Sequence, residues 1–248
     1  MHAAKLTRIL GAVVVLLCSS GCSIATMSDQ RLTDEYCAGR LSFDDIQSAA
    51  RAGHPAAQFL VGLAFESGEG VATDPVRARE WYVEAAAGGH PAALNNLGLM
   101  HFRGEGGDKL HARARQLLLR AADRGFVAGM VNYAIVCLYS NDQDPDGAAA
   151  TRMLRRAAEL DHPPAYKLLA TIYYEGVGIE ADFERAAHYY AKAARRGDAL
   201  SQHRLAIQHL NGNGVAQDNA RAAKWLERAA EQGYAPCLLY TSPSPRDS

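Results

Sequence analysis

A unit of 36 residues recurs five times without insertion, and this repetition constrains the fold more than any other feature of the chain. The copies occupy residues 53–88, 89–124, 125–160, 161–196 and 197–232. A strict period between about 20 and 50 residues is typical of stacked-repeat proteins, in which each unit buries its apolar face against the next. The chain is therefore predicted to form a nearly one-dimensional array.

Each unit is predicted to contain two helices joined by a turn. In the first half of the second copy, Leu97, Gly98 and His101 mark one face at helical spacing. The paired glycines Gly68 and Gly70, which recur in the second, fourth and fifth copies, favour a helix end followed by a turn with positive φ. An aspartate that can cap the second helix follows at one repeat position: Asp74, Asp146, Asp182 and Asp218. These signals predict one helical hairpin per copy.

The second helix of each unit carries a pair of alanines that is the same in every copy. Side chains this small let two helix axes approach to within ~8–10 Å, where a larger side chain would clash. The pairs are Ala85–Ala86, Ala121–Ala122, Ala157–Ala158, Ala193–Ala194 and Ala229–Ala230. Tight packing between neighbouring helices is therefore expected along the whole array.

These patterns resemble the Sel-one-like repeat (SLR) family, which is related to the tetratricopeptide repeats. The resemblance covers Gly53 to Pro236 and rests on Gly68-x-Gly70, Asp74-x-x-Arg77-Ala78, Trp81-Tyr82 and Ala85-Ala86-x-x-Gly89. It implies an all-α, right-handed superhelical solenoid of antiparallel helix pairs, in which the first helices line a concave face that binds protein or peptide partners. The third copy departs from the pattern, because residues 140–146 replace the double-glycine turn.

The concave face implied by the resemblance is the candidate binding site. Three positions of the first helix differ between copies while the packing positions do not, which fits a surface that recognises a partner. Arg103, Tyr139 and Glu175 are expected near the groove edge as polar anchors. The candidate residues are Phe59, Leu63, Asn95, Leu99, Phe102, Arg103, Val131, Ile135, Tyr139, Lys167, Tyr174, Glu175, His203 and Ile207. The alternative interpretation is that these positions vary simply because they are exposed.

The residues before the repeats divide into three parts. Residues 1–21 combine a basic start, an apolar run and small residues, as in a bacterial signal peptide. This part resembles a lipoprotein signal, which implies lipid on Cys22 and a place on the periplasmic side of the outer membrane; plain secretion is the alternative. Residues 22–40 are polar and predict a tether. Residues 41–52 align with a second helix and predict an N-terminal capping half-repeat.

The repeat pattern stops near the C-terminus. Residues 233–236 open a sixth copy in phase, whereas residues 237–248 no longer match. This last stretch resembles the translation of a transposase adapter used in sequencing libraries, so we expect it to be foreign to the protein and exclude it from the fold. A natural Ser/Pro-rich tail is the alternative.

Charge and cysteine usage limit the classes of partner and of cross-link. The formal net charge is −1 and no basic patch stands out, so a nucleic-acid partner is not expected. Cys37 precedes the first copy and Cys137 belongs to the third. Because successive helices pack ~10 Å apart and a disulfide needs Cα atoms within ~7 Å, we predict no bond between these two cysteines.

Two groups of residues contain potential metal ligands, but neither forms a full set of ligands in the sequence. Asp142, Asp144 and Asp146 match the opening of a calcium-binding loop, but the twelfth position is Met153, so a solvated turn is favoured. Histidines precede the repeats' first helices at one repeat position and are interpreted as turn residues: His54, His90 and His162. His101 and His209 share a position with aromatic residues and are expected in the core.

No constellation of residues indicates catalysis or a cofactor site. The sequence has no related Ser/His/Asp or Cys/His set, and its Gly-x-Gly pairs lie where repeats turn. The prediction is a non-enzymatic scaffold of the bacterial cell envelope without cofactor or metal. One alternative, by resemblance to outer-membrane lipoproteins with similar repeats, is a scaffold for polysaccharide export. The other is a cell-wall enzyme linked to penicillin binding, which is disfavoured because the cysteine pairs of that branch are missing here.

Overall fold

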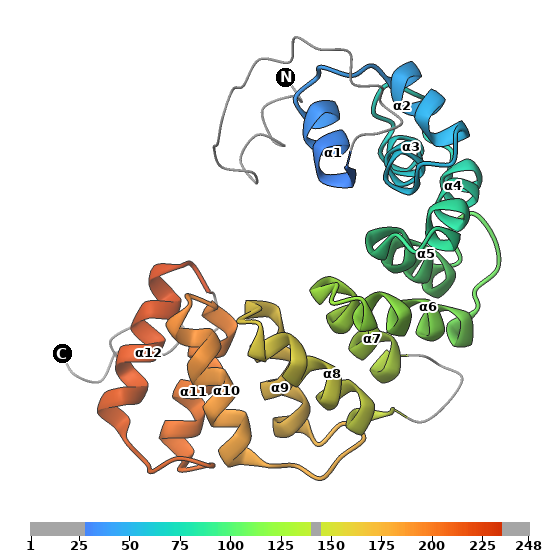
Figure 1. Ribbon diagram of the computed structural model, residues 1–248. Coiled ribbons are helices and arrows are strands. Elements are labelled where there is room, and N and C mark those ends of the chain that lie inside the picture. Colours follow the sequence, from blue (N-terminus) through green and yellow to red (C-terminus); the bar gives the residue numbers. More distant parts are fainter. Residues whose placement is uncertain (1–27, 140–144, 235–248) are drawn as a thin grey trace.

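The computed structural model describes residues 28–139 and 145–234, and every regular element in this part of the chain is an α-helix (Figure 1). Consecutive helices form antiparallel pairs, and each pair packs against the next. The predicted all-α solenoid is thereby confirmed. The described residues contain α1 (Asp29–Cys37), α2 (Phe43–Arg51), α3 (Pro55–Ser67), α4 (Pro75–Ala87), α5 (Pro91–Arg103), α6 (His111–Asp123), α7 (Val127–Tyr139), α8 (Gly147–Glu159), α9 (Pro163–Glu175), α10 (Phe183–Arg195), α11 (Ala199–Asn211) and α12 (Asn219–Glu231).

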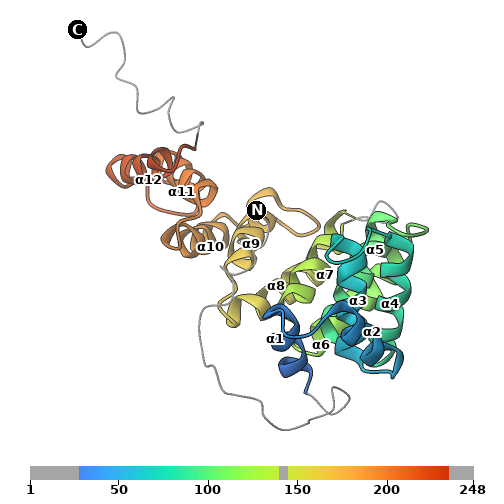
Figure 2. The same ribbon diagram turned by 90° about the horizontal axis from the view of Figure 1, so that it is seen from above.

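The helix pairs follow an arc that is open between α1 and α12 (Figure 1). The first helices α3, α5, α7 and α9 lie along the inner side of this arc, and the second helices α4, α6 and α8 lie along the outer side. From α1 to α12 the chain turns clockwise in Figure 1 and moves away from the viewer, as the view from above shows (Figure 2). The superhelix is therefore right-handed, as predicted.

The aspartates at the predicted cap position begin the second helices of four repeats. Asp74 accepts hydrogen bonds from the amides of Val76 and Arg77 at 3.1 Å, which satisfies two donors that the first helical turn leaves open. Asp146, Asp182 and Asp218 cap α8, α10 and α12 in the same way. In the second repeat Leu110 stands at this position, and its side chain makes no cap hydrogen bond.

The paired glycines serve both the turn and the packing between repeats. The first glycine of each described pair ends its helix in the left-handed region, as Gly176 does with φ of 68°. The second glycine has positive φ as well, and at Gly178 an added Cβ would overlap the backbone of Pro145 and Gly147 at the start of α8. This close approach locks one repeat's turn against the second helix of the preceding repeat.

Alanines and large side chains alternate in the core between helices. Ala85, Ala121 and Ala157 are completely buried, and the aromatic ring of Tyr82 fills the space beside them in the first repeat. His101 and His209 are buried as predicted. Cys137 is buried in α7 and Cys37 is exposed at the end of α1, and both are free thiols.

The segment predicted as a tether is partly helical, and this corrects the interpretation of residues 22–40. Ser28 caps α1 by accepting from the Arg31 amide. Leu32 is completely buried and Tyr36, one turn later, packs on the same core cluster, which extends from α1 to α6. One apolar contact per turn is enough to dock this short helix on α3, although its sequence falls outside the repeat.

The elbow between the third and fourth repeats has an aspartate where the other repeats have glycine. Asp161 has φ of 56° and is the one non-glycine residue with positive φ among the described residues. Its carboxylate accepts hydrogen bonds from the Tyr166 hydroxyl and the Arg196 guanidinium. Aspartate tolerates this conformation better than most residues. Residues 140–144 of the third copy's turn, which include Asp142 and Asp144, lie outside the described residues.

Candidate functional site

The concave face, defined as the surface that the first helices of the repeats present to the inner side of the arc, carries most of the predicted binding residues. Tyr139 is 63% exposed and Leu63 is 37% exposed, although both are large and apolar. Arg103 and Glu175 are exposed at the ends of their helices. The half-buried candidates are Phe59, Leu99, Phe102, Ile135, Lys167, Tyr174, His203 and Ile207. Side chains of these twelve residues therefore reach solvent.

Two predicted residues offer little surface to a partner and correct the candidate set. Asn95 is only 5% exposed and Val131 only 7% exposed. Both are covered because consecutive first helices approach closely here, and α5 contacts α7 directly. The residues that follow them, Asn96 and Asn132, are the half-exposed ones at this level of the face.

A chain of side-chain hydrogen bonds runs across the N-terminal half of the concave face. The Asn132 amide donates to Asn95 Oδ1 at 2.8 Å, and the Asn95 amide donates to Asn96 Oδ1 at 3.1 Å. The Asn96 amide donates to the Tyr82 hydroxyl at 3.2 Å, and this hydroxyl donates to the Glu66 carboxylate. Burial, followed by the hydrogen bond to Glu66, raises the pKa of Tyr82 above its usual value. The chain links three repeats through neutral donors.

Charged pairs replace this amide chain in the C-terminal half of the face. Lys167 Nζ lies 3.1 Å from Asp198 Oδ2, which ties α9 to the start of α11. Arg204 lies 3.9 Å from the Glu175 carboxylate and stacks over the Tyr174 ring at 5.6 Å. The concave face thus changes along its length from amide and apolar groups to charged and aromatic groups.

Sequence reasoning missed one repeat position that contributes to this face. The residues concerned are half-exposed: Asn96, Asn132, Leu168 and Arg204. The sequence signal that could have identified this position is its variation between copies, from leucine to asparagine to arginine. In the first repeat the equivalent residue is Leu60, which is buried. These residues directly follow the predicted candidates Asn95, Val131, Lys167 and His203. The observed face is therefore rotated around the helix by about one residue from the predicted face.

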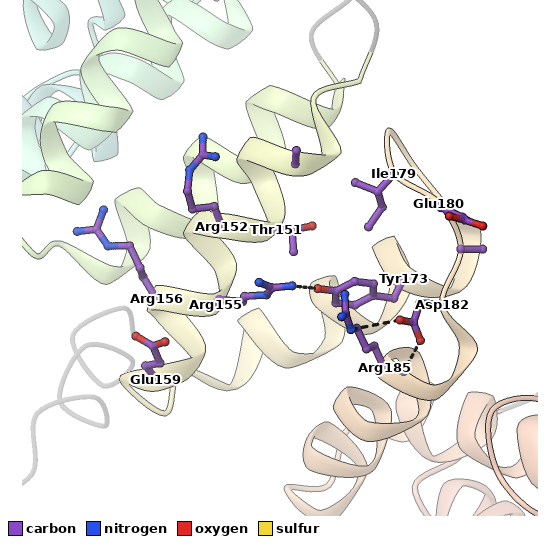
Figure 3. A pocket seen from close by; sticks show the side chains of 12 residues that line it. Thr151, Arg152, Arg155, Arg156, Glu159, Tyr173, Ile179, Glu180, Asp182 and Arg185 are labelled. Atoms are coloured by element: carbon purple, nitrogen blue, oxygen red, sulfur yellow. Dashed lines mark hydrogen bonds and ion pairs between the residues drawn. The ribbon is translucent and has the colours of Figure 1, made fainter.

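A second surface lies between the second helices α8 and α10, away from the concave face. We call this cavity of about 890 Å³ the α8–α10 cleft; it is lined by α8, by Tyr173 of α9, by residues 179–182 of the turn and by Arg185 of α10 (Figure 3). Its basic residues are Arg152, Arg155, Arg156 and Arg185. Sequence reasoning did not predict this surface.

Three of the four arginines in the α8–α10 cleft already have partners. Arg155 donates to the Tyr173 hydroxyl, and Arg185 lies 3.2 Å from the carboxylate of Asp182 (Figure 3). Arg156 lies 3.5 Å from the carboxylate of Asp123 on α6. Arg152 is exposed, and among the described residues no carboxylate lies within ion-pair distance of it. The cleft therefore presents hydrogen-bond donors and positive charge to solvent.

The described residues hold no group of three His, Cys, Asp or Glu side chains placed to bind a metal ion. Within the same residues, no helix is both long and apolar enough to cross a membrane. His54, His90 and His162 occupy the N-cap positions of α3, α5 and α9, so their interpretation as turn residues is confirmed. Cys22 lies outside the described residues.

The comparisons with known proteins agree with this geometry. The Sel1 repeat model matches residues 55–90, 91–126, 127–162, 163–198 and 199–234. The chain belongs to the Sel1 repeat family. The matched units begin two residues after the repeat boundaries chosen from the sequence and keep the same period. As a Sel1 repeat protein, the chain is a helical scaffold of the kind whose extended curved surfaces commonly bind proteins.

The solved structures that are similar over most of the chain include two with an identity above 25%. One is the protective antigen c5321 of uropathogenic Escherichia coli, which displays an SLR fold; the identity is 29%, the TM-score is 0.77, and the match covers 86% of this chain and 47% of that one. This chain thus spans about half the length of the antigen. The other is a Sel1 repeat protein from Oxalobacter formigenes, with 26% identity, a TM-score of 0.72, and coverage of 88% of this chain and 86% of that one. The comparison with curated proteins gives no match.

Proposed function

We propose that this Sel1 repeat protein is a non-catalytic adaptor that binds a protein or peptide along its concave face. The observation that carries the proposal is the exposure of large apolar side chains on that face, above all Tyr139 at 63% and Leu63 at 37%. Neighbouring positions of the same helices, such as Gly62 and Cys137, are buried. Aromatic and aliphatic side chains that stay exposed in the folded protein are typical anchors for a protein partner.

The change of chemistry along the face supports an extended segment as the partner. The amide chain of α5 and α7 can exchange hydrogen bonds with a peptide backbone, because Asn96 and Asn132 are half-exposed. The pairs formed by Lys167 and Arg204 present charge of both signs to the other end of such a segment. A partner that lies along the arc would meet both regions in turn.

The proposed place of action is the bacterial cell envelope, with the chain anchored through lipid on Cys22. Support comes from the leader sequence alone, in which an apolar run ends in small residues before this cysteine. Replacing Cys22 by serine is expected to release the protein from the membrane fraction. Unchanged fractionation, together with no lipid mass on the wild-type protein, would favour plain secretion.

Site-specific photo-crosslinking in the native host tests the binding proposal. A photoreactive amino acid at Leu63 or Tyr139 is expected to give a discrete adduct with one partner. Val83 is the matched control, because it is a similarly exposed apolar residue (46%) on the second helix α4. Equal adducts from Val83, or none from either concave position, would contradict the proposal.

A further inference from the structure

The α8–α10 cleft contains a buried polar group that the described fold leaves unsatisfied. Thr151 is only 6% exposed, and its hydroxyl has no hydrogen-bond partner among the described residues. Figure 3 shows this hydroxyl directed toward the space between α8 and the turn that carries Ile179. A buried hydroxyl without a partner carries a free-energy cost, so its persistence at a cavity wall points to a group that arrives from outside.

Thr151 and two arginines share one side of α8. Arg155 lies one helical turn beyond Thr151, so the two side chains are neighbours on the helix surface. Arg155 extends across the cleft and donates to the Tyr173 hydroxyl (Figure 3). Arg152 lines the same cleft without a carboxylate partner among the described residues, but its guanidinium group points away from Thr151 and Arg155 (Figure 3). A guanidinium group and a hydroxyl at this spacing can hold a single oxyanion from two directions.

The next repeat contains the same cleft without these groups. The cavity between α10 and α12 has a volume of about 590 Å³, and it is lined by residues at equivalent repeat positions. There Ala187 replaces Thr151, His188 replaces Arg152 and Ala191 replaces Arg155. Alanine at these positions is therefore enough for neighbouring repeats to pack. The polar groups of the α8–α10 cleft are not needed for the helices to stack.

The carboxylates at the rim of the α8–α10 cleft limit how much negative charge a ligand can carry. Glu159 and Glu180 stand at opposite ends of the cleft and repel a second negative charge (Figure 3). Ile179, together with alanines of α8 and of the turn, supplies an apolar wall beside the polar floor. A single carboxylate on a short apolar segment fits the cleft, because it brings one negative charge and apolar groups for the wall. A polyanion such as a nucleic acid would be repelled by the two glutamates.

We infer that the α8–α10 cleft binds a carboxylate side chain of a partner protein, held by Thr151 and Arg155, with Arg152 adding positive charge to the same cleft. The volume of about 890 Å³ matches cavities that take a few residues of a ligand. The carboxylate accepts from the Thr151 hydroxyl and the Arg155 guanidinium group, and the flanking apolar side chains contact Ile179. This surface is separate from the concave face, so its test does not depend on the function proposed above.

Calorimetric titration of the full chain with two synthetic peptides tests this inference. The probe is acetyl-Gly-Leu-Glu-Leu-Gly-amide, and the control peptide carries glutamine in place of glutamate. We expect saturable binding of the glutamate peptide, and binding weaker by about tenfold or more for the glutamine peptide, because a charge-assisted hydrogen bond is lost. A shift of the Thr151 methyl resonance on titration locates the site.

Matched variants connect the binding to the named groups. Thr151→Ala and Arg155→Ala each introduce the residue found at the same position of the next repeat, so both are expected to fold, as thermal melting can verify. Each is expected to weaken binding of the glutamate peptide about tenfold. Lys224→Ala, in the cleft between α10 and α12, is the control and is expected to leave the affinity unchanged.

Three results would overturn the inference. The first is the absence of saturable binding by the glutamate peptide, or equal binding of the two peptides. The second is a loss of affinity in Lys224→Ala as large as that in Arg155→Ala. The third is tighter binding of inorganic phosphate than of the glutamate peptide in the same cleft, which would assign the site to a phosphate group.

Discussion

The Asn132 amide donates a hydrogen bond to Asn95 Oδ1 at 2.8 Å, and this bond connects the first helices of two consecutive repeats. Asn95 is 5% exposed, so water cannot easily replace its partners. Apolar contacts alone would let α5 and α7 rotate against each other at small cost, whereas a buried amide pair has one satisfied arrangement. The curvature of the N-terminal half of the concave face therefore depends on this pair.

Removal of the buried amide is expected to destabilise the repeats. Asn95→Ala deprives both Asn132 and Asn96 of a partner, and we expect the free energy of unfolding to fall by about 1–3 kcal/mol in urea denaturation. Asn211→Ala, at the exposed end of α11, is the control and should change it by less than about 0.5 kcal/mol. Equal losses in the two variants would show that the amide chain has no structural role.

Two tyrosines at one repeat position differ in what holds their hydroxyl groups. Tyr82 donates to Glu66 and accepts from Asn96, whereas the Tyr190 hydroxyl lies 3.5 Å from Thr171 Oγ1. Both rings are buried. Tyr82→Phe is expected to lower the free energy of unfolding by about 1 kcal/mol, and Tyr190→Phe by less. A larger loss for Tyr190→Phe in the same denaturation assay would contradict the prediction.

Asp198 is expected to make stability depend on pH in the acidic range. Burial raises the pKa of Asp198, but the Ser201 hydroxyl and amide and the Lys167 ammonium group outweigh burial and hold it below the ordinary value of 3.8. Because the folded-state pKa is the lower one, the stabilisation is fully present above 3.8 and is lost as the pH falls through the lowered value.

Asp198→Ala measures this contribution. It removes the cap of α11 and is expected to cost about 1 kcal/mol at neutral pH. Urea denaturation should show the difference from the wild type shrinking as the pH falls below 3.8. If the difference in the free energy of unfolding between the two proteins stays constant or grows in acid, the lowered pKa assigned to Asp198 is wrong.

Gly178 is expected to tolerate substitution less well than Gly125. Both have positive φ, but a Cβ at Gly125 meets no atom within 4 Å, whereas one at Gly178 overlaps the backbone at the start of α8. Gly125→Ala should cost about 1–2 kcal/mol from backbone strain alone. Gly178→Ala should cost about 1–3 kcal/mol more because of overpacking, as denaturation can measure. Similar costs would mean that the turn can move away from α8.

Most of the fold could be predicted because the same signals for helix ends recur in four of the five repeats. Asp74 and its equivalents mark the helix starts, and the glycine pairs mark the turns. Helix α1 was missed because it stands outside the period, and the apolar side chains that dock it are those of Leu32 and Tyr36. An isolated apolar pair at helical spacing in a polar segment does not distinguish a docked helix from a tether.

The binding surfaces were predicted less completely than the fold. Variation between copies identified Leu63, and the expected groove edge identified Tyr139. Neither signal could reveal that Asn95 turns inward, since that depends on the rotation of α5 against α7. The α8–α10 cleft combines Thr151 with Tyr173 of another helix, and this proximity arises only when repeats stack. Its signal in the sequence is the presence of Thr151 and Arg155 where the next copy has alanine.

If the chain is anchored through Cys22, as proposed, the docking of α1 would limit how far the array stands from the membrane. With lipid on Cys22, as proposed, the chain between this residue and the Ser28 cap would reach at most about 22 Å even when fully extended, at ~3.6 Å per residue. The first repeat would then be confined to a thin layer beside the bilayer. A partner would have to be present in that same layer, so the anchor would select partners by their distance from the membrane as well as by their chemistry.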